Sequence, residues 1–95
     1  MAIGADRSWT VNPLVSAAPM DAGVVLIDAA TGECFELNRV GTEIWTALQG
    51  GTPPTQIAAD LADRYGVPLA QVAADVDRLF EQMIARGILR VAVDR

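Results

Sequence analysis

The chain has 95 residues, enough for one small domain but too few for a catalytic domain beside a separate binding domain. Hydrophobic residues make up 52% and charged residues 20%, which favours a folded core over intrinsic disorder. The formal net charge is −5, so a nucleic-acid partner is disfavoured and a neutral or basic peptide is the better match.

The missing residue types exclude most familiar chemistry. The sequence has no histidine and no lysine, which removes the commonest general base, the commonest metal ligand and the Schiff-base amine. The single cysteine, Cys34, excludes an internal disulfide and fits a reducing compartment. No window approaches 18 continuous apolar residues, and no secretion signal is present. We therefore expect a cytoplasmic, non-catalytic protein with no metal, no cofactor and no membrane or nucleic-acid partner.

Strand signals fill the N-terminal part of the chain. Residues 1–10 are small or polar around Trp9, so we expect a loosely ordered segment there, with the Trp9 indole as its docking side chain. Strands are predicted at residues 14–16, 24–27 and 33–37. Pro19 and Gly23 interrupt the backbone after the first of them. The second and third strands form a hairpin across the turn at residues 28–32.

Three amphipathic helices are predicted after the hairpin. Asn38 is expected to cap the first helix and Gly50 to end it, Thr52 to cap the second, and Pro68 to open the third. The apolar stripes are Val40, Ile44, Trp45 and Leu48; Ile57, Ala58, Leu61, Ala62 and Tyr65; and Leu69, Val72, Ala73, Val76, Leu79, Phe80, Met83 and Ile84. Residues 88–93 form either a short closing strand or a packed tail.

Strands followed by helices predict a single α+β domain over residues 1–95, with a three-stranded antiparallel N-terminal sheet packed on three helices. Winged helix-turn-helix domains are built in the same way, so a DNA-binding regulator is the second hypothesis. It is disfavoured because the exposed face of the third helix carries three acids and one arginine. These residues are Asp75, Asp77, Glu81 and Arg78. A small enzyme or enzyme subunit is the third hypothesis, which the missing histidine and lysine disfavour.

Short motifs follow one another from Val24 to Leu89, about two thirds of the chain. They are Phe35-Glu36-Leu37-Asn38, Gly41, Ile44-Trp45-Thr46-Ala47-Leu48, Gly50-Gly51, Ile57 through Tyr65-Gly66, Asp75-Val76, Leu79-Phe80, Met83 and Gly87-Ile88-Leu89. Their order and spacing resemble the PqqD-like family, the RiPP recognition elements that hold the leader peptide of a ribosomally made precursor. The resemblance implies a winged helix-turn-helix-like fold, in which the leader adds as an antiparallel strand between the third strand and the third helix.

Within that family the chain is most similar to the discrete leader-binding protein of lasso-peptide biosynthesis, which works with a separately encoded leader peptidase. Fused versions and the free-standing partners of radical enzymes are the alternatives within the family. The implied peptide-binding residues are Glu33, Cys34, Phe35, Glu36 and Leu37 on the strand, and Val72, Asp75, Val76 and Leu79 on the third helix. The strand is expected to act chiefly through its backbone. Asp75 either pairs with a basic leader residue or an amide, or is a solvated acid beside Arg78.

Three further residues have plain structural interpretations. Cys34 is expected to be a strand residue rather than a nucleophile, because the sequence has no histidine to activate it. Trp45 lies on the apolar stripe of the first helix and is expected in the core. Trp9 either covers the sheet or contacts a partner protein.

Overall fold

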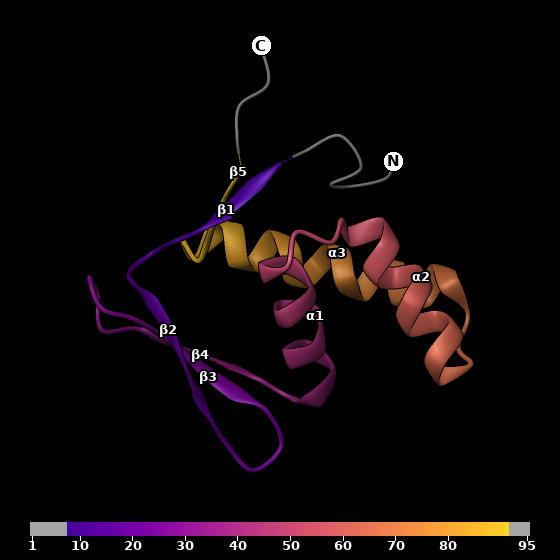
Figure 1. Ribbon diagram of the computed structural model, residues 1–95, viewed down its shortest axis with the longest axis horizontal. Helices are drawn as coiled ribbons and strands as arrows, with labels where there is room; N and C mark the ends of the chain where they lie inside the picture. Colours follow the sequence, from indigo (N-terminus) through magenta and orange to yellow (C-terminus); the bar gives the residue numbers. More distant parts are fainter. Residues whose placement is uncertain (1–7, 92–95) are drawn as a thin grey trace.

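The computed structural model describes residues 8–91, and its elements follow the predicted order of strands, three helices and a closing strand (Figure 1). The elements are β1 (Trp9–Val11), β2 (Val15–Pro19), β3 (Val24–Asp28), β4 (Cys34–Leu37), α1 (Arg39–Gln49), α2 (Pro54–Tyr65), α3 (Leu69–Ala85) and β5 (Leu89–Val91). Strands β2, β3 and β4 form an antiparallel sheet in that order, and β1 pairs with β5 in a separate ribbon. The predicted α+β class, with a three-stranded antiparallel sheet and three helices, is confirmed.

The three-stranded sheet turns one face toward the core. In the β3–β4 register, Leu26 lies opposite Phe35. Val24 lies opposite Leu37 on the same face, because directly paired residues of antiparallel strands share a face. Leu26 and Leu37 are buried, and the other two pack against the core. The predicted alternation of β4 is therefore present, with its remaining two side chains exposed.

Local signals set most of the helix ends. The Asn38 side chain accepts a hydrogen bond at 2.8 Å from a backbone N–H in the first turn and caps α1, as predicted. Gly66 ends α2 with a φ of 64°, in the left-handed region that glycine adopts at low cost. The predicted Thr52 cap is wrong. Pro53 takes the cap position with no side-chain cap bond, because the second proline rather than the first opens the helix.

The N-terminal segment is better anchored than its composition suggests. From Trp9 onward the chain forms β1, while residues 1–7 of the expected loose segment lie outside the described part. The Trp9 indole packs edge-to-face on Phe80, with ring centroids 5.6 Å apart. Its Nε1–H donates to the Leu48 carbonyl at 3.1 Å. Trp9 is therefore a structural residue at the junction of β1, α1 and α3. Of the two alternatives for residues 88–93, the structure has the closing strand, as β5.

Asn12 fastens this segment to the end of α3. Its Nδ2 donates to the Gly87 carbonyl at 2.9 Å, and its Oδ1 accepts from the Leu14 N–H at 2.9 Å. Its backbone N–H donates to the Ile88 carbonyl at 2.9 Å. Asn12 is the buried polar residue of the described chain, and these bonds compensate the loss of its contacts with water.

The helices enclose the rest of the core. Trp45 is 3% exposed, which confirms its predicted place in the core. At the surface, Tyr65 Oη donates to Glu43 at 2.5 Å, and this bond raises the pKa of the Tyr65 phenol. Arg64 pairs with the same carboxylate, so α1 and α2 are linked at their outer sides. Within residues 8–91, no helix combines the length and apolar character needed to cross a membrane.

Candidate functional site

An open groove runs between the β4 strand and α3, with the first turns of α1 as its floor. It holds a volume of about 610 Å³. The lining residues are Phe35, Glu36, Leu37, Asn38, Val40, Gly41, Ile44, Asp75, Arg78, Leu79 and Gln82. The groove thus lies between β4 and α3, the two elements on which the peptide-binding residues were predicted.

The β4 edge beside this groove offers unpaired backbone groups. The Asp28 N–H donates to the Glu33 carbonyl at 3.0 Å, so residues 33, 35 and 37 turn their backbone groups toward β3. By the same alternation, Cys34 and Glu36 direct their N–H and C=O groups away from the sheet. Within the described chain β4 pairs only with β3, so these groups can receive another strand.

The opposite edge of the sheet, on β2, is largely closed. Pro19 lies at an outward-facing position and has no N–H to offer. The Val15 N–H also faces outward but already donates to the Asn12 carbonyl at 3.0 Å. Ala17 is the remaining outward-facing residue of β2. Strand addition is therefore favoured at the β4 edge, where Cys34 and Glu36 both turn a free N–H and a free C=O group outward.

The α3 wall combines one apolar residue with polar neighbours. Leu79 is half-buried and packs partly against the core, so its remaining surface faces the groove. Asp75 and Arg78 form an ion pair at 2.6 Å, with side chains that are 55% and 61% exposed. Asp75 thus pairs with Arg78 in this structure, and its contact with a leader peptide stays a prediction. At this exposure the ion pair contributes little to stability, and a ligand can replace it.

The floor of the groove was missed by the sequence analysis. Val40 is 42% exposed and Ile44 is buried, and both lie on α1 and line the groove. Gly41 lies between them, where a Cβ would meet the Leu37 side chain at 3.2 Å. The first turn of α1 therefore approaches β4 closely enough to close the bottom of the groove. The sequence carries no signal for this, because Val40 falls on the same apolar stripe as the core residues of the first helix.

Two predicted helix residues do not reach the groove. Val76 is 1% exposed and belongs to the core, so it offers no surface to the groove in this structure, and its contact with a peptide stays a prediction. Successive helix positions are about 100° apart, which turns Val76 inward while Asp75 and Leu79 face the groove. Val72 is half-buried, packs against the core and does not line the groove.

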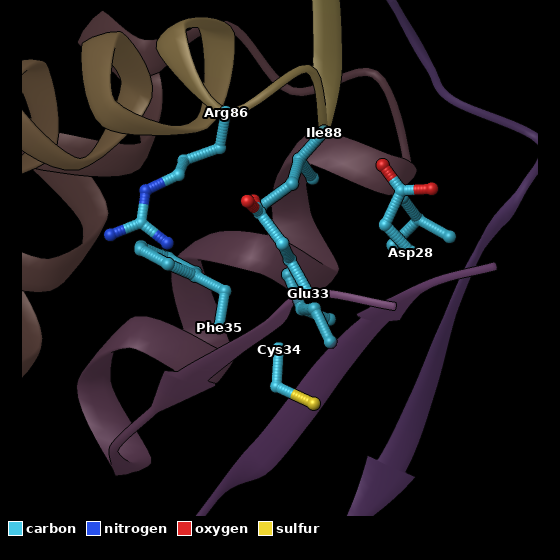
Figure 2. Close-up of a pocket in the computed structure, with 8 residues that line it drawn as sticks. Asp28, Glu33, Cys34, Phe35, Arg86 and Ile88 are labelled. Carbon is cyan, nitrogen blue, oxygen red and sulfur yellow. The ribbon is translucent and has the colours of Figure 1, made fainter. Parts of the chain in front are cut away.

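Two of the predicted strand residues, Glu33 and Cys34, line a second, much smaller cavity and not the groove (Figure 2). It encloses about 10 Å³, roughly the room that one water molecule needs. Phe35 separates it from the groove, and the Arg86 guanidinium lies 5.2 Å from the centroid of the Phe35 ring, within cation–π range. The Cys34 sulfur points away from these side chains, and Cys34 is exposed (Figure 2).

The described residues carry no cluster of histidine, cysteine or carboxylate groups that could hold a metal ion. The groove contains an apolar strip, an ion pair and free backbone groups, which suit binding of an extended chain better than bond making or breaking.

Comparisons with known proteins agree with this geometry. The family described as coenzyme PQQ synthesis protein D (PqqD) matches residues 23–89, whereas no curated protein matches the chain. One similar solved structure is TbiB1 in complex with the TbiA(beta) leader peptide, 28% identical, with a TM-score of 0.79 over 90% of this chain and 99% of that one. Another is lasso peptide synthetase B1 complexed with the leader peptide, 28% identical, with a TM-score of 0.80 over 87% of this chain and 98% of that one. The chain therefore belongs to the PqqD family and has the fold of a PqqD-like RiPP recognition element.

Proposed function

We propose that this protein binds the leader segment of a ribosomally made precursor peptide as an added antiparallel strand on β4. The observation that carries the proposal is the free edge of β4, where Cys34 and Glu36 face outward, beside a groove whose lining includes apolar side chains of β4, α1 and α3. The backbone of the leader would supply affinity by hydrogen bonding to β4, and its alternate side chains would enter the groove. Both similar structures hold leader peptides, which supports the same ligand class here.

The proposed role is delivery rather than catalysis. A separately encoded leader peptidase of the lasso-peptide type would act on the bound precursor, and the domain would raise the local concentration of substrate at that enzyme. The absence of histidine and lysine from the sequence supports an adaptor without catalysis of its own.

Fluorescence polarisation tests leader binding directly. The probe is a fluorescein-labelled synthetic leader of the precursor encoded nearest to this gene, titrated with the wild type and with Leu79→Arg. We expect saturable binding by the wild type and a Kd at least about tenfold higher for the variant, because a charged side chain replaces the apolar residue of the α3 wall. Leu79→Ala, which adds no charge, should weaken binding less.

Leu69→Arg is the matched control for this experiment. Leu69 is also an apolar residue of α3, 54% exposed, and it does not line the groove. Its Kd should stay within about twofold of the wild type. Thermal melts of all variants separate a lost contact from a lost fold. No saturable binding of the leader by a folded wild type, or equal weakening by both arginine substitutions, contradicts the proposal. Tighter binding of a duplex DNA probe would favour the regulator hypothesis instead.

A proline substitution tests the backbone mechanism. The Glu36 N–H faces away from β3, so Glu36→Pro removes a donor from the free edge while leaving the β3–β4 ladder intact. Glu36→Ala lacks the same carboxylate but keeps the N–H. We expect the proline variant to bind the leader about tenfold more weakly than the alanine variant, since one hydrogen bond is lost and the ring obstructs the added strand. Equal Kd values by fluorescence polarisation would contradict strand addition at this edge.

A further inference from the structure

The outer face of the sheet carries one acidic side chain at the receiving edge. Residues that alternate with the core-facing ones lie on this face, and they are Ser16, Ala18, Val25, Ile27, Cys34 and Glu36. None of them is basic. Glu36 is exposed and forms no ion pair or side-chain hydrogen bond among the described residues. Its carboxylate is therefore available to a side chain that arrives beside it.

Strand addition would place one ligand residue directly beside that carboxylate. Because the N–H and C=O of Glu36 face the free edge, an antiparallel strand would form a hydrogen-bonded pair between Glu36 and one residue of the ligand. Directly paired residues lie on the same face with Cβ atoms about 5 Å apart. The side chain of that ligand residue would stand on the outer face, next to Glu36 and outside the groove.

The neighbouring ligand residues would point the other way. The residue before the paired one would lie opposite Leu37, and the residue after it opposite Phe35, so both would face the groove and the apolar side of Leu79. One further residue along, the ligand would return to the outer face beside Cys34. The receiving edge thus offers a carboxylate to one ligand residue and apolar side chains to the residues before and after it.

We infer that Glu36 is a specificity-determining residue, which selects a leader segment with a lysine or arginine at the position paired with it and an apolar residue on either side. This inference rests on the proposed leader binding and adds to it a requirement for sequence. Opposite charges at directly paired positions favour binding, and like charges there oppose it. The contribution is moderate because Glu36 is exposed, and added salt screens it.

A charge-swap experiment tests the pairing. Each position of the labelled leader is replaced in turn by lysine and by glutamate, and every peptide is titrated against the wild type and Glu36→Lys. With the wild type, one position should bind lysine about three- to tenfold more tightly than glutamate. With Glu36→Lys the preference at that position should invert. At about 1 M salt, where the screening length is about 3 Å, both preferences should fall below about twofold.

Asp63→Lys is the control for overall charge. Asp63 is an exposed acid of α2 outside the groove, so its substitution changes the net charge by the same amount without changing the receiving edge. It should leave the preference of every position in the same sense as in the wild type. If the leader binds and no position inverts with Glu36→Lys, or if positions invert equally with Asp63→Lys, the inference is wrong while leader binding stands. If no leader peptide binds, both fail.

Discussion

Phe80→Ala should lower the free energy of unfolding by about 3–5 kcal/mol, a large part of the stability that a domain of this size has. Phe80 is fully buried at the centre of the core, and its ring meets the edge of Trp9. Removing the ring leaves a cavity and also removes the surface that holds β1 against α3. Urea denaturation followed by circular dichroism should give the difference, and the melting temperature should fall by more than about 10 °C.

Phe35→Ala makes the same chemical deletion at a half-buried position and should cost clearly less stability. A second readout separates the two contributions to the Phe80 effect. The fluorescence of Trp9 and Trp45 should shift toward that of exposed indole in Phe80→Ala under conditions where the helices persist. Similar unfolding free energies for the Phe35 and Phe80 variants would contradict the central place given to Phe80.

Gly23→Ala should destabilise the fold by about 3 kcal/mol or more, although glycine is replaced by the smallest possible side chain. A Cβ at this position would lie 1.8 Å from the Leu37 carbonyl oxygen and 2.9 Å from its carbonyl carbon. Both are backbone atoms, so β3 and the end of β4 must separate to make room. Because that end of β4 forms the rim of the groove, the variant should also bind the leader peptide more weakly.

Gly32→Ala is the matched control, because it strains the backbone without crowding. Gly32 has a φ of 78° in the turn between β3 and β4, and nothing lies within 4 Å of its would-be Cβ. It should cost about 1–2 kcal/mol from the left-handed conformation alone. Urea denaturation of both variants compares the two mechanisms, and a smaller loss for Gly23→Ala than for Gly32→Ala would contradict the close approach.

The architecture was predictable where local signals decide it. Asn38 and Gly66 mark helix ends through their own side-chain and backbone preferences, so spacing along the chain is sufficient to find them. The hairpin and its receiving strand follow from alternation around a turn. These signals depend on residues within a few positions of each other, so they can be recognised in the sequence without the tertiary structure.

The remaining features depend on contacts between distant segments. Trp9 is anchored by Leu48 and Phe80, which no pattern near the N-terminus reveals. The face that α3 turns to the groove depends on how the helix is rotated by its packing, and this rotation puts Val76 in the core. The floor at Val40 was missed for the same reason, since it requires the position of α1 relative to β4.

The difference between the two sheet edges limits how many extended peptides one domain can hold. With Pro19 and the Asn12–Val15 bond on β2, the three-stranded sheet is much more receptive on the β4 side. The three-stranded sheet would thus accept one added strand, and a titration of this site would end at one equivalent of peptide. The same asymmetry opposes the joining of these three-stranded sheets edge to edge in an open-ended series, because each new contact would need a second receptive edge on the same sheet.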